Sequence, residues 1–252
     1  MKKSSRSYGW KPDLPDRRDI PYSLVFKVKK KLPESVDLRN LCSTVEDQGT
    51  LGSCTAQALT SALEVQEKIQ GKNFVDMSRL FVYYNERAME GTVSQDSGAM
   101  IRDGIKSLVK QGCCTEDKWP YNIEKFRTKP KAECYADGLT HQVLAYQRLN
   151  LLNEMLSCLA DGFPFVFGFS VYEGFESEYV ARTGKLEMPE NSEKLIGGHA
   201  VMAVGFNSKN KRLIVRNSWG SDWGMKGYFT MPYDYVADRN LSDDFWTIRS
   251  ME

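Results

Sequence analysis

The chain has few histidines and no long apolar run. Only His141 and His199 occur among its 252 residues, so few side chains titrate near neutral pH. The longest apolar stretch, residues 163–171, contains a proline and is too short to span a bilayer. The start of the chain lacks the apolar core of a signal peptide. We therefore expect no membrane partner, and a chain that is cytoplasmic at synthesis or exported without a classical leader.

The cysteines lack the spacing of a metal site. Six are present, at positions 42, 54, 113, 114, 134 and 158, without a Cys-x-x-Cys pair. This pattern is not typical of zinc sites, so we expect no metal and no cofactor. Although six cysteines permit three disulfides, we do not predict a disulfide framework. This favours a reducing compartment at synthesis.

The charge is nearly balanced overall but uneven along the chain. The formal net charge is +1, yet residues 1–31 alone carry ten Lys/Arg against three Asp, which leaves −6 for the rest. No basic patch interleaved with aromatic residues follows, so no nucleic-acid partner is expected. The basic leader is either a solubilising tail or a segment attracted to the acidic body.

The order of predicted elements indicates an α+β protein. Residues 1–31 should be extended because Pro12, Pro15 and Pro21 interrupt helical periodicity, and the alternation from Tyr22 onward favours a strand. Helices are predicted at 53–70, after the N-cap Ser78 to 91, at 99–111 and at 151–160. Strands are predicted at 163–171, 199–206, 212–217, 227–231 and 245–249. We expect a leader at 1–31, a mainly helical part at 32–135 and a mainly β part at 136–252, with a crevice between the last two.

Three short motifs could support chemistry. Cys54 stands at the predicted start of the longest helix, where the helix dipole favours a thiolate. His199 follows two glycines and leads into an apolar strand, and Asn217 ends the next strand in Asn-Ser-Trp-Gly. Taken alone, the cysteine and the histidine each favour a structural role, as a packed thiol and a buried imidazole, and Asn-Ser-Trp-Gly could be a turn.

Taken together, the motifs resemble the papain-like cysteine peptidase family. Gln48, the Gly-Ser-Cys ending at Cys54, the Gly-His-Ala around His199 and the Asn-Ser-Trp-Gly from Asn217 occur in the family's order, over about 220 residues that start at Leu32. The likeness is to a divergent microbial or viral-type branch with a short N-terminal extension. It implies a two-lobed papain-like fold: a helical left lobe with Cys54, a β-barrel-like right lobe with His199 and Asn217, and the active site in the crevice.

The resemblance also implies residue roles. Cys54 would be the nucleophile and His199 its acid and base, while Asn217 orients the imidazole. Gln48 would stabilise the oxyanion. Substrate would contact Ser97, Gly98, Gly197, Gly198, Ala200 and Trp219. The pocket for the second residue before the scissile bond should lie near Ala200 and Gly197, have its floor in residues 234–241, and take an apolar side chain.

Several positions depart from the family pattern without removing a catalytic atom. Leu51 replaces a disulfide cysteine, Thr55 replaces an aromatic residue, and Leu38 replaces a tryptophan. The common helical inhibitory prosegment is much longer than 31 residues. Our hypothesis is that residues 8–30 partly cover the active site as a zymogen-like intramolecular inhibitor.

The function expected from this resemblance is an endopeptidase that acts on proteins or peptides through a Cys54 thioester, as a monomer. Two alternatives stay open. The same acyl-enzyme could be captured by an amine, which would make the protein a ligase. An inactive papain-fold binding protein is the other, although all four catalytic positions are occupied by the residues that catalysis requires.

Overall fold

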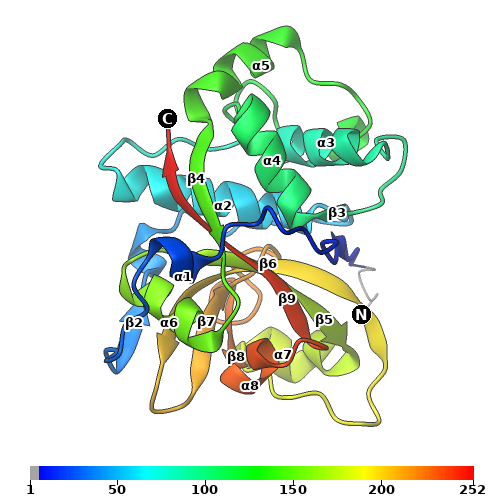
Figure 1. The fold of residues 1–252 in the computed structure, drawn as a ribbon. Coiled ribbons are helices and arrows are strands. Elements are labelled where there is room, and N and C mark those ends of the chain that lie inside the picture. The colour runs from blue at the N-terminus through cyan, green and yellow to red at the C-terminus, as the bar shows by residue number, and fades with distance from the viewer. Residues whose placement is uncertain (1–5) are drawn as a thin grey trace.

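The computed structural model describes residues 6–252, so residues 1–5 of the expected leader lie outside the described residues. The fold is α+β with two lobes (Figure 1), one built around helices and the other around an antiparallel sheet. The α+β prediction is confirmed.

A buried helix forms the centre of the molecule. Helix α2, Cys54–Ile69, buries every residue from 54 to 67, as expected for a helix enclosed on all sides. It packs against α3 (Arg79–Glu90), α4 (Ile101–Gln111) and the sheet. The predicted N-cap is correct, because Ser78 Oγ accepts the Phe81 N–H at 3.1 Å.

The sheet has seven strands and carries the second lobe. Its order is β4-β9-β5-β6-β7-β8, and β2 also pairs with β6. The strands are β2 (Ser35–Asp37), β4 (Val143–Arg148), β5 (Phe165–Tyr172), β6 (Leu195–Asn207), β7 (Arg212–Arg216), β8 (Tyr228–Pro232) and β9 (Ser242–Met251). All pairs within this sheet are antiparallel. Each of the last five strands overlaps one of the five predicted strand regions, with ends that differ by at most a few residues.

Shorter elements connect these parts. The α-helices are α5 (Ala132–Gly138), α6 (Leu152–Ala160), α7 (Glu178–Thr183) and α8 (Tyr233–Ala237). The 3₁₀ turns are η1 (Arg39–Leu41), η2 (Ile123–Lys125), η3 (Leu139–His141) and η4 (Glu173–Glu176).

Two predictions are wrong, one within the leader and one at the segment that pairs with it. The strand predicted from Tyr22 is wrong, because residues Tyr22–Val25 form the single-turn helix α1. Tyr22 is buried there and its hydroxyl donates to Asp161 Oδ2 at 2.8 Å, a contact that overrides the local alternation. The helix predicted from residue 99 starts at Ile101 instead. Residues Ala99–Met100 form β3, which pairs in parallel with the leader strand β1, Trp10–Lys11.

A buried carboxylate fastens the leader to both lobes. Asp13 Oδ2 accepts the indole N–H of Trp246 at 3.0 Å, and Oδ1 accepts the Arg102 backbone N–H at 3.1 Å. The Asp13 N–H donates to Asp244 Oδ2 at 2.8 Å. Further along, the Arg102 guanidinium pairs with Asp19. The leader between β1 and α1 is therefore held by hydrogen bonds at both ends.

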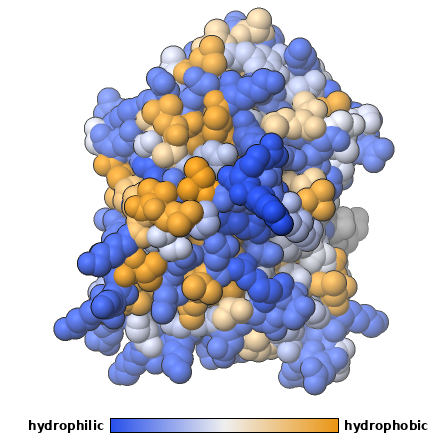
Figure 2. All heavy atoms as spheres, in the orientation of Figure 1, coloured by the Kyte–Doolittle hydropathy of each residue, from blue (hydrophilic) through white to orange (hydrophobic). Residues whose placement is uncertain are grey.

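The surface over the leader is mixed in character. Figure 2 shows an apolar patch over α1 beside strongly hydrophilic atoms, and Leu24 is 79% exposed there. No helix within residues 6–252 is both long and apolar enough to cross a membrane.

Replacing Asp13 should loosen the leader. In Asp13→Ala the Trp246 and Arg102 N–H groups lose their acceptor, so we expect the free energy of unfolding to fall by about 1–3 kcal/mol. Urea denaturation measures this change, and trypsin should cut more quickly near Arg17. Asp16→Ala is the matched control, since Asp16 pairs with its exposed neighbour Arg18. Equal stability of the two variants would contradict the anchoring role.

Candidate active site

Cys54 lies at the N-terminus of α2 and is fully buried. The backbone N–H groups of Ala200 and Gly9 lie beside its thiol and act to lower its pKa. Burial nevertheless dominates and raises the pKa of Cys54 to about 11. The thiol therefore keeps its proton as long as water is excluded from its surroundings.

His199 and Asn217 are joined by a short hydrogen bond. His199 is on β6, and its Nε2–H donates to Asn217 Oδ1 at 2.8 Å, just beyond the end of β7. His199 Nδ1 is buried without a hydrogen-bond partner among the described residues. Burial lowers the pKa of His199 to about 4. Since the imidazole pKa lies far below that of Cys54, both groups are neutral in this closed arrangement.

Gln48 is oriented by a residue that sequence reasoning missed. The Ser218 hydroxyl donates to Gln48 Oε1 at 2.6 Å, which turns Gln48 Nε2 outward to donate to the carbonyl of Leu51 at 2.9 Å and that of Ser7 at 3.2 Å. The Gln48 N–H also donates to the Ser218 carbonyl at 2.9 Å. The Asn-Ser-Trp-Gly motif thus fixes both the imidazole and the Gln48 amide.

An aromatic cluster shields this contact. The ring centroids of Trp219 and His199 are 5.2 Å apart, and Phe175 lies 5.0 Å from Trp219. Trp219 is buried, and Trp223 packs edge-on against it. Such packing excludes water from the hydrogen bond between His199 and Asn217.

The leader fills the cleft along these residues. Gly9 approaches so closely that a Cβ on it would lie 1.8 Å from the Gly52 carbonyl oxygen. A Cβ on Gly98 would lie 2.0 Å from the Gly9 carbonyl oxygen. Tyr8 packs against His199 with centroids 5.9 Å apart, and its hydroxyl donates to Glu176 at 2.5 Å. Close approach of two backbones requires glycine at these positions.

The predicted substrate-contact residues are mostly, but not all, in this cleft. Gly98 faces Gly9, while Gly197 faces Tyr8 and Gly198 faces Trp10. Ala200 is buried and its N–H reaches Cys54. Ser97 differs, because its hydroxyl is engaged within its own loop, with Thr92 Oγ1 at 2.9 Å and the Gly98 carbonyl at 3.0 Å. The floor of the substrate pocket is predicted at residues 234–241. Among the described residues, none of these forms a hydrogen bond with the Trp10 side chain, whose indole N–H donates to Asp244 instead.

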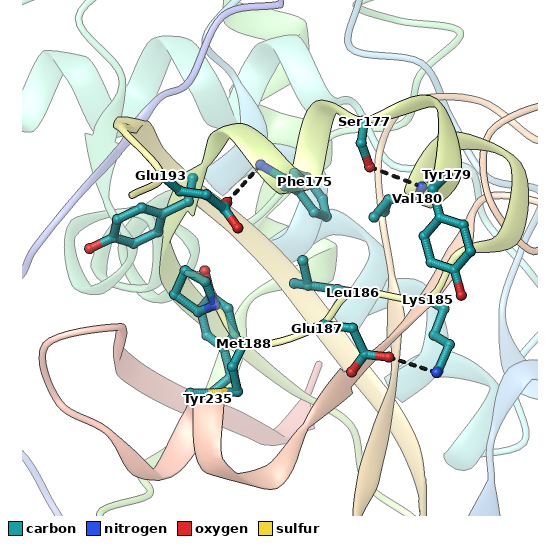
Figure 3. Close-up of a pocket in the computed structure, with 13 residues that line it drawn as sticks. Phe175, Ser177, Tyr179, Val180, Lys185, Leu186, Glu187, Met188, Glu193 and Tyr235 are labelled. Carbon is teal, nitrogen blue, oxygen red and sulfur yellow. Dashed lines mark hydrogen bonds and ion pairs between the residues drawn. The ribbon is translucent and has the colours of Figure 1, made fainter. Parts of the chain in front are cut away.

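A separate pocket lies on the sheet lobe (Figure 3). Its volume is about 120 Å³, and Phe175, Val180, Leu186, Met188 and Tyr235 are among its lining residues. The Lys185–Glu187 ion pair lies at its edge. Neither Cys54 nor His199 lines this pocket, although its lining residue Phe175 lies 6.2 Å from the His199 ring. Within residues 6–252 no group of His, Cys, Asp or Glu is arranged to hold a metal ion, and all six cysteines are free thiols.

Comparison with known proteins decides the family. The model of the papain family cysteine protease matches residues 32–244. An uncharacterized peptidase C1-like protein of Acanthamoeba polyphaga mimivirus is 43% identical, over 98% of this chain and 88% of its own. The chain belongs to the papain family.

Structural and further sequence relatives agree with this assignment. The crystal structure of xylellain, a cysteine protease from Xylella fastidiosa, matches with a TM-score of 0.92 and 38% identity, covering 100% of this chain and 99% of that one. Cathepsin B-like CP3 of Giardia intestinalis is 30% identical over 85% of this chain and 73% of its own. Like these papain-family relatives, the protein is a cysteine peptidase, a hydrolase.

Sequence reasoning missed four contributors to the papain-family site: Gly52, Gly168, Ser218 and Asp244. Gly168 carried a usable signal, since a lone glycine within the apolar run Phe-Val-Phe-Gly-Phe marks close approach of another group. Asp244 carried none, because its place at the cleft depends on a bulge in β9.

Opening the cleft should change the pH dependence of Cys54. In the intact chain, alkylation of Cys54 by iodoacetamide should rise only toward pH 11, as burial dictates. Gly9→Val cannot keep the observed backbone approach, so water should enter and the midpoint should move to a lower pH. Leu14→Ala, an exposed leader position, is the control. Peptide mapping follows Cys54 alone, and identical profiles for Gly9→Val and the intact chain would refute this account.

Proposed function

We propose that the protein is an endopeptidase that hydrolyses peptide bonds through a thioester on Cys54, with His199 as acid and base. The observation that carries the proposal is the 2.8 Å bond from His199 Nε2 to Asn217 Oδ1. This bond leaves the other ring nitrogen, Nδ1, free to exchange a proton. His199 directly precedes Ala200, whose backbone N–H lies beside the Cys54 thiol.

The chemistry follows from these groups. The thiol proton passes to His199 and the sulfur attacks the substrate carbonyl carbon, forming a C–S bond. The C–N bond then breaks as His199 returns its proton to the leaving amine. Water attacks the thioester while His199 takes one of its protons. Release of the carboxylic acid breaks the C–S bond and restores the thiol and the neutral imidazole.

Gln48 would stabilise the charge that develops on the carbonyl oxygen. In the closed structure its Nε2 donates to the Ser7 carbonyl, so this donor already points at a carbonyl in the cleft. Preorganised donors of this kind lower the barrier because they need no reorientation during reaction. Ser218 acts as a positioning residue through its bond to Gln48 Oε1.

We further propose that the leader is an intramolecular inhibitor. Ser7 occupies the Gln48 donor, and Gly9 presents an N–H to the Cys54 thiol. The leader backbone therefore lies between the nucleophile and an incoming substrate. By excluding water, it also favours the neutral thiol and imidazole over the reactive ion pair.

Substitutions in the site should separate these roles. Cys54→Ala should abolish hydrolysis of fluorogenic peptides, whereas Gln48→Ala should lower kcat about 10²–10³-fold, as the loss of one oxyanion donor does. Thermal melting checks folding. An inactive binding protein would retain its biological effect in Cys54→Ala, and a ligase would form amide products when an amine acceptor is added.

Displacing the leader should raise activity. We expect kcat/KM for small peptide substrates to be higher in Gly9→Val than in the intact chain, because the substrate no longer competes with residues 7–10. Leu14→Ala should behave like the intact chain. Unchanged kcat/KM in Gly9→Val, together with proteolytic evidence that β1 has left the cleft, would rule out inhibition by the leader.

A further inference from the structure

The ring of Trp10 occupies a pocket beside the catalytic residues. A Cβ on Gly168 would lie 1.9 Å from Trp10 Cε2, and one on Gly198 would lie 2.9 Å from Trp10 Cε3. Trp10 follows Gly9, whose N–H meets the Cys54 thiol. The pocket, hereafter the Trp10 pocket, therefore accepts a side chain from a backbone that passes the nucleophile. Gly168 is paired with Ala200 across β5 and β6, so this is the region expected to receive the second residue before the scissile bond.

A buried carboxylate closes the Trp10 pocket. Asp244 Oδ2 accepts the indole N–H of Trp10 at 3.0 Å. Between Val166↔Trp246 and Gly168↔Asp243 the β5–β9 register shifts, and Asp244 has a φ of 56°. This bulge turns the Asp244 side chain toward the pocket. The side chain is only 1% exposed.

Among residues 6–252, the two donors to Asp244 Oδ2 both belong to the leader. They are the Trp10 indole N–H and the Asp13 backbone N–H at 2.8 Å. Asp244 Oδ1 is engaged by Arg148 at 3.0 Å, and this partner lies outside the leader. When the leader leaves, Oδ2 becomes a buried acceptor without a donor. Such an atom is costly unless an incoming group hydrogen-bonds to it.

The charges around the pocket favour a neutral donor over a second cation. Arg148 pairs with Asp243 and Asp244, and Arg239 also pairs with Asp243 at 2.6 Å. Arg148 also pairs with Asp19 of the leader at 3.1 Å. Once the leader leaves, two guanidinium groups face the two carboxylates Asp243 and Asp244. Without the leader, Asp244 Oδ2 lacks an N–H donor. The missing side chains of Gly168 and Gly198 leave room beside it for a flat ring.

We propose that Asp244 is a specificity-determining residue, and that the opened enzyme prefers peptides with tryptophan in the Trp10 pocket. This inference rests on the proposed peptidase function. It replaces the simple apolar preference expected from the family resemblance, because an aliphatic side chain would leave Asp244 Oδ2 unpaired. The leader's own Trp10 then acts as a copy of the preferred side chain.

The test uses the full chain opened by Gly9→Val, with Trp10→Ala as a second background in case the first folds poorly. Three peptidyl epoxides differ only at the residue for this pocket: tryptophan, 3-benzothienylalanine or leucine. Benzothienylalanine keeps the size of the indole but lacks its N–H. Intact-mass spectrometry gives the second-order rate constant for labelling Cys54, and iodoacetamide reports thiol reactivity without the pocket.

The expected result is about tenfold faster labelling by the tryptophan epoxide than by the benzothienylalanine one, as befits a hydrogen bond to a charged acceptor. In Asp244→Asn, which tolerates the positive φ, this ratio should fall severalfold because a neutral amide accepts a weaker bond. Asp243→Asn, the matched control, should keep the ratio. Burial raises the pKa of Asp244, so the assays use pH 8 rather than neutral pH to favour the charged carboxylate.

Failures of the two proposals are distinguishable. Equal rates for tryptophan and benzothienylalanine, a faster leucine compound, or an unchanged ratio in Asp244→Asn would overturn the role of Asp244. Labelling by iodoacetamide but by none of the epoxides would overturn it too. If Cys54 in the opened chain reacts with neither reagent class while the fold is intact, the proposed peptidase mechanism itself fails.

Discussion

The structure depends on how closely the leader backbone approaches the cleft. Gly9 lies between Gly52 and Gly98, and any side chain on Gly9 would strike the Gly52 carbonyl. This approach brings the Gly9 N–H to the Cys54 thiol and the Ser7 carbonyl to Gln48. It also seats Trp10 over Gly168 and Gly198. One steric constraint therefore determines which donors are occupied, how dry the site is, and which pocket is filled.

The exclusion of water by the leader affects the ionisation of Cys54 and His199. Burial raises the pKa of Cys54 to about 11 and lowers that of His199 to about 4, so the proton stays on sulfur. An ion pair between the two residues needs water or other polar groups to offset desolvation. Removal of the leader would admit water and move both pKa values toward each other. In the proposed inhibitory role, the same segment would control both access to the nucleophile and its ionisation.

The polar contacts that hold the leader are shared with the substrate pocket. Asp244 accepts N–H groups from both Trp10 and Asp13, while Asp13 in turn binds Trp246 and the Arg102 backbone. Because these groups are buried, each is costly to leave unpaired. The leader is retained by filling them, and a substrate would have to satisfy Asp244 in its place. Inhibition and specificity would then depend on one carboxylate.

The sequence by itself determined the family, the α+β class and the longer elements. The helix from Cys54 and the capped helix after Ser78 are as predicted, because periodicity and capping are local signals. The order of the Gln48, Cys54, His199 and Asn217 motifs identified the family, while their catalytic roles stay predictions. Only the tertiary structure decided the helical turn at Tyr22, the orientation of Gln48 by Ser218, and the meeting of Trp10 with Asp244. These depend on contacts between residues up to 234 positions apart and on a bulge in β9, which no local pattern encodes.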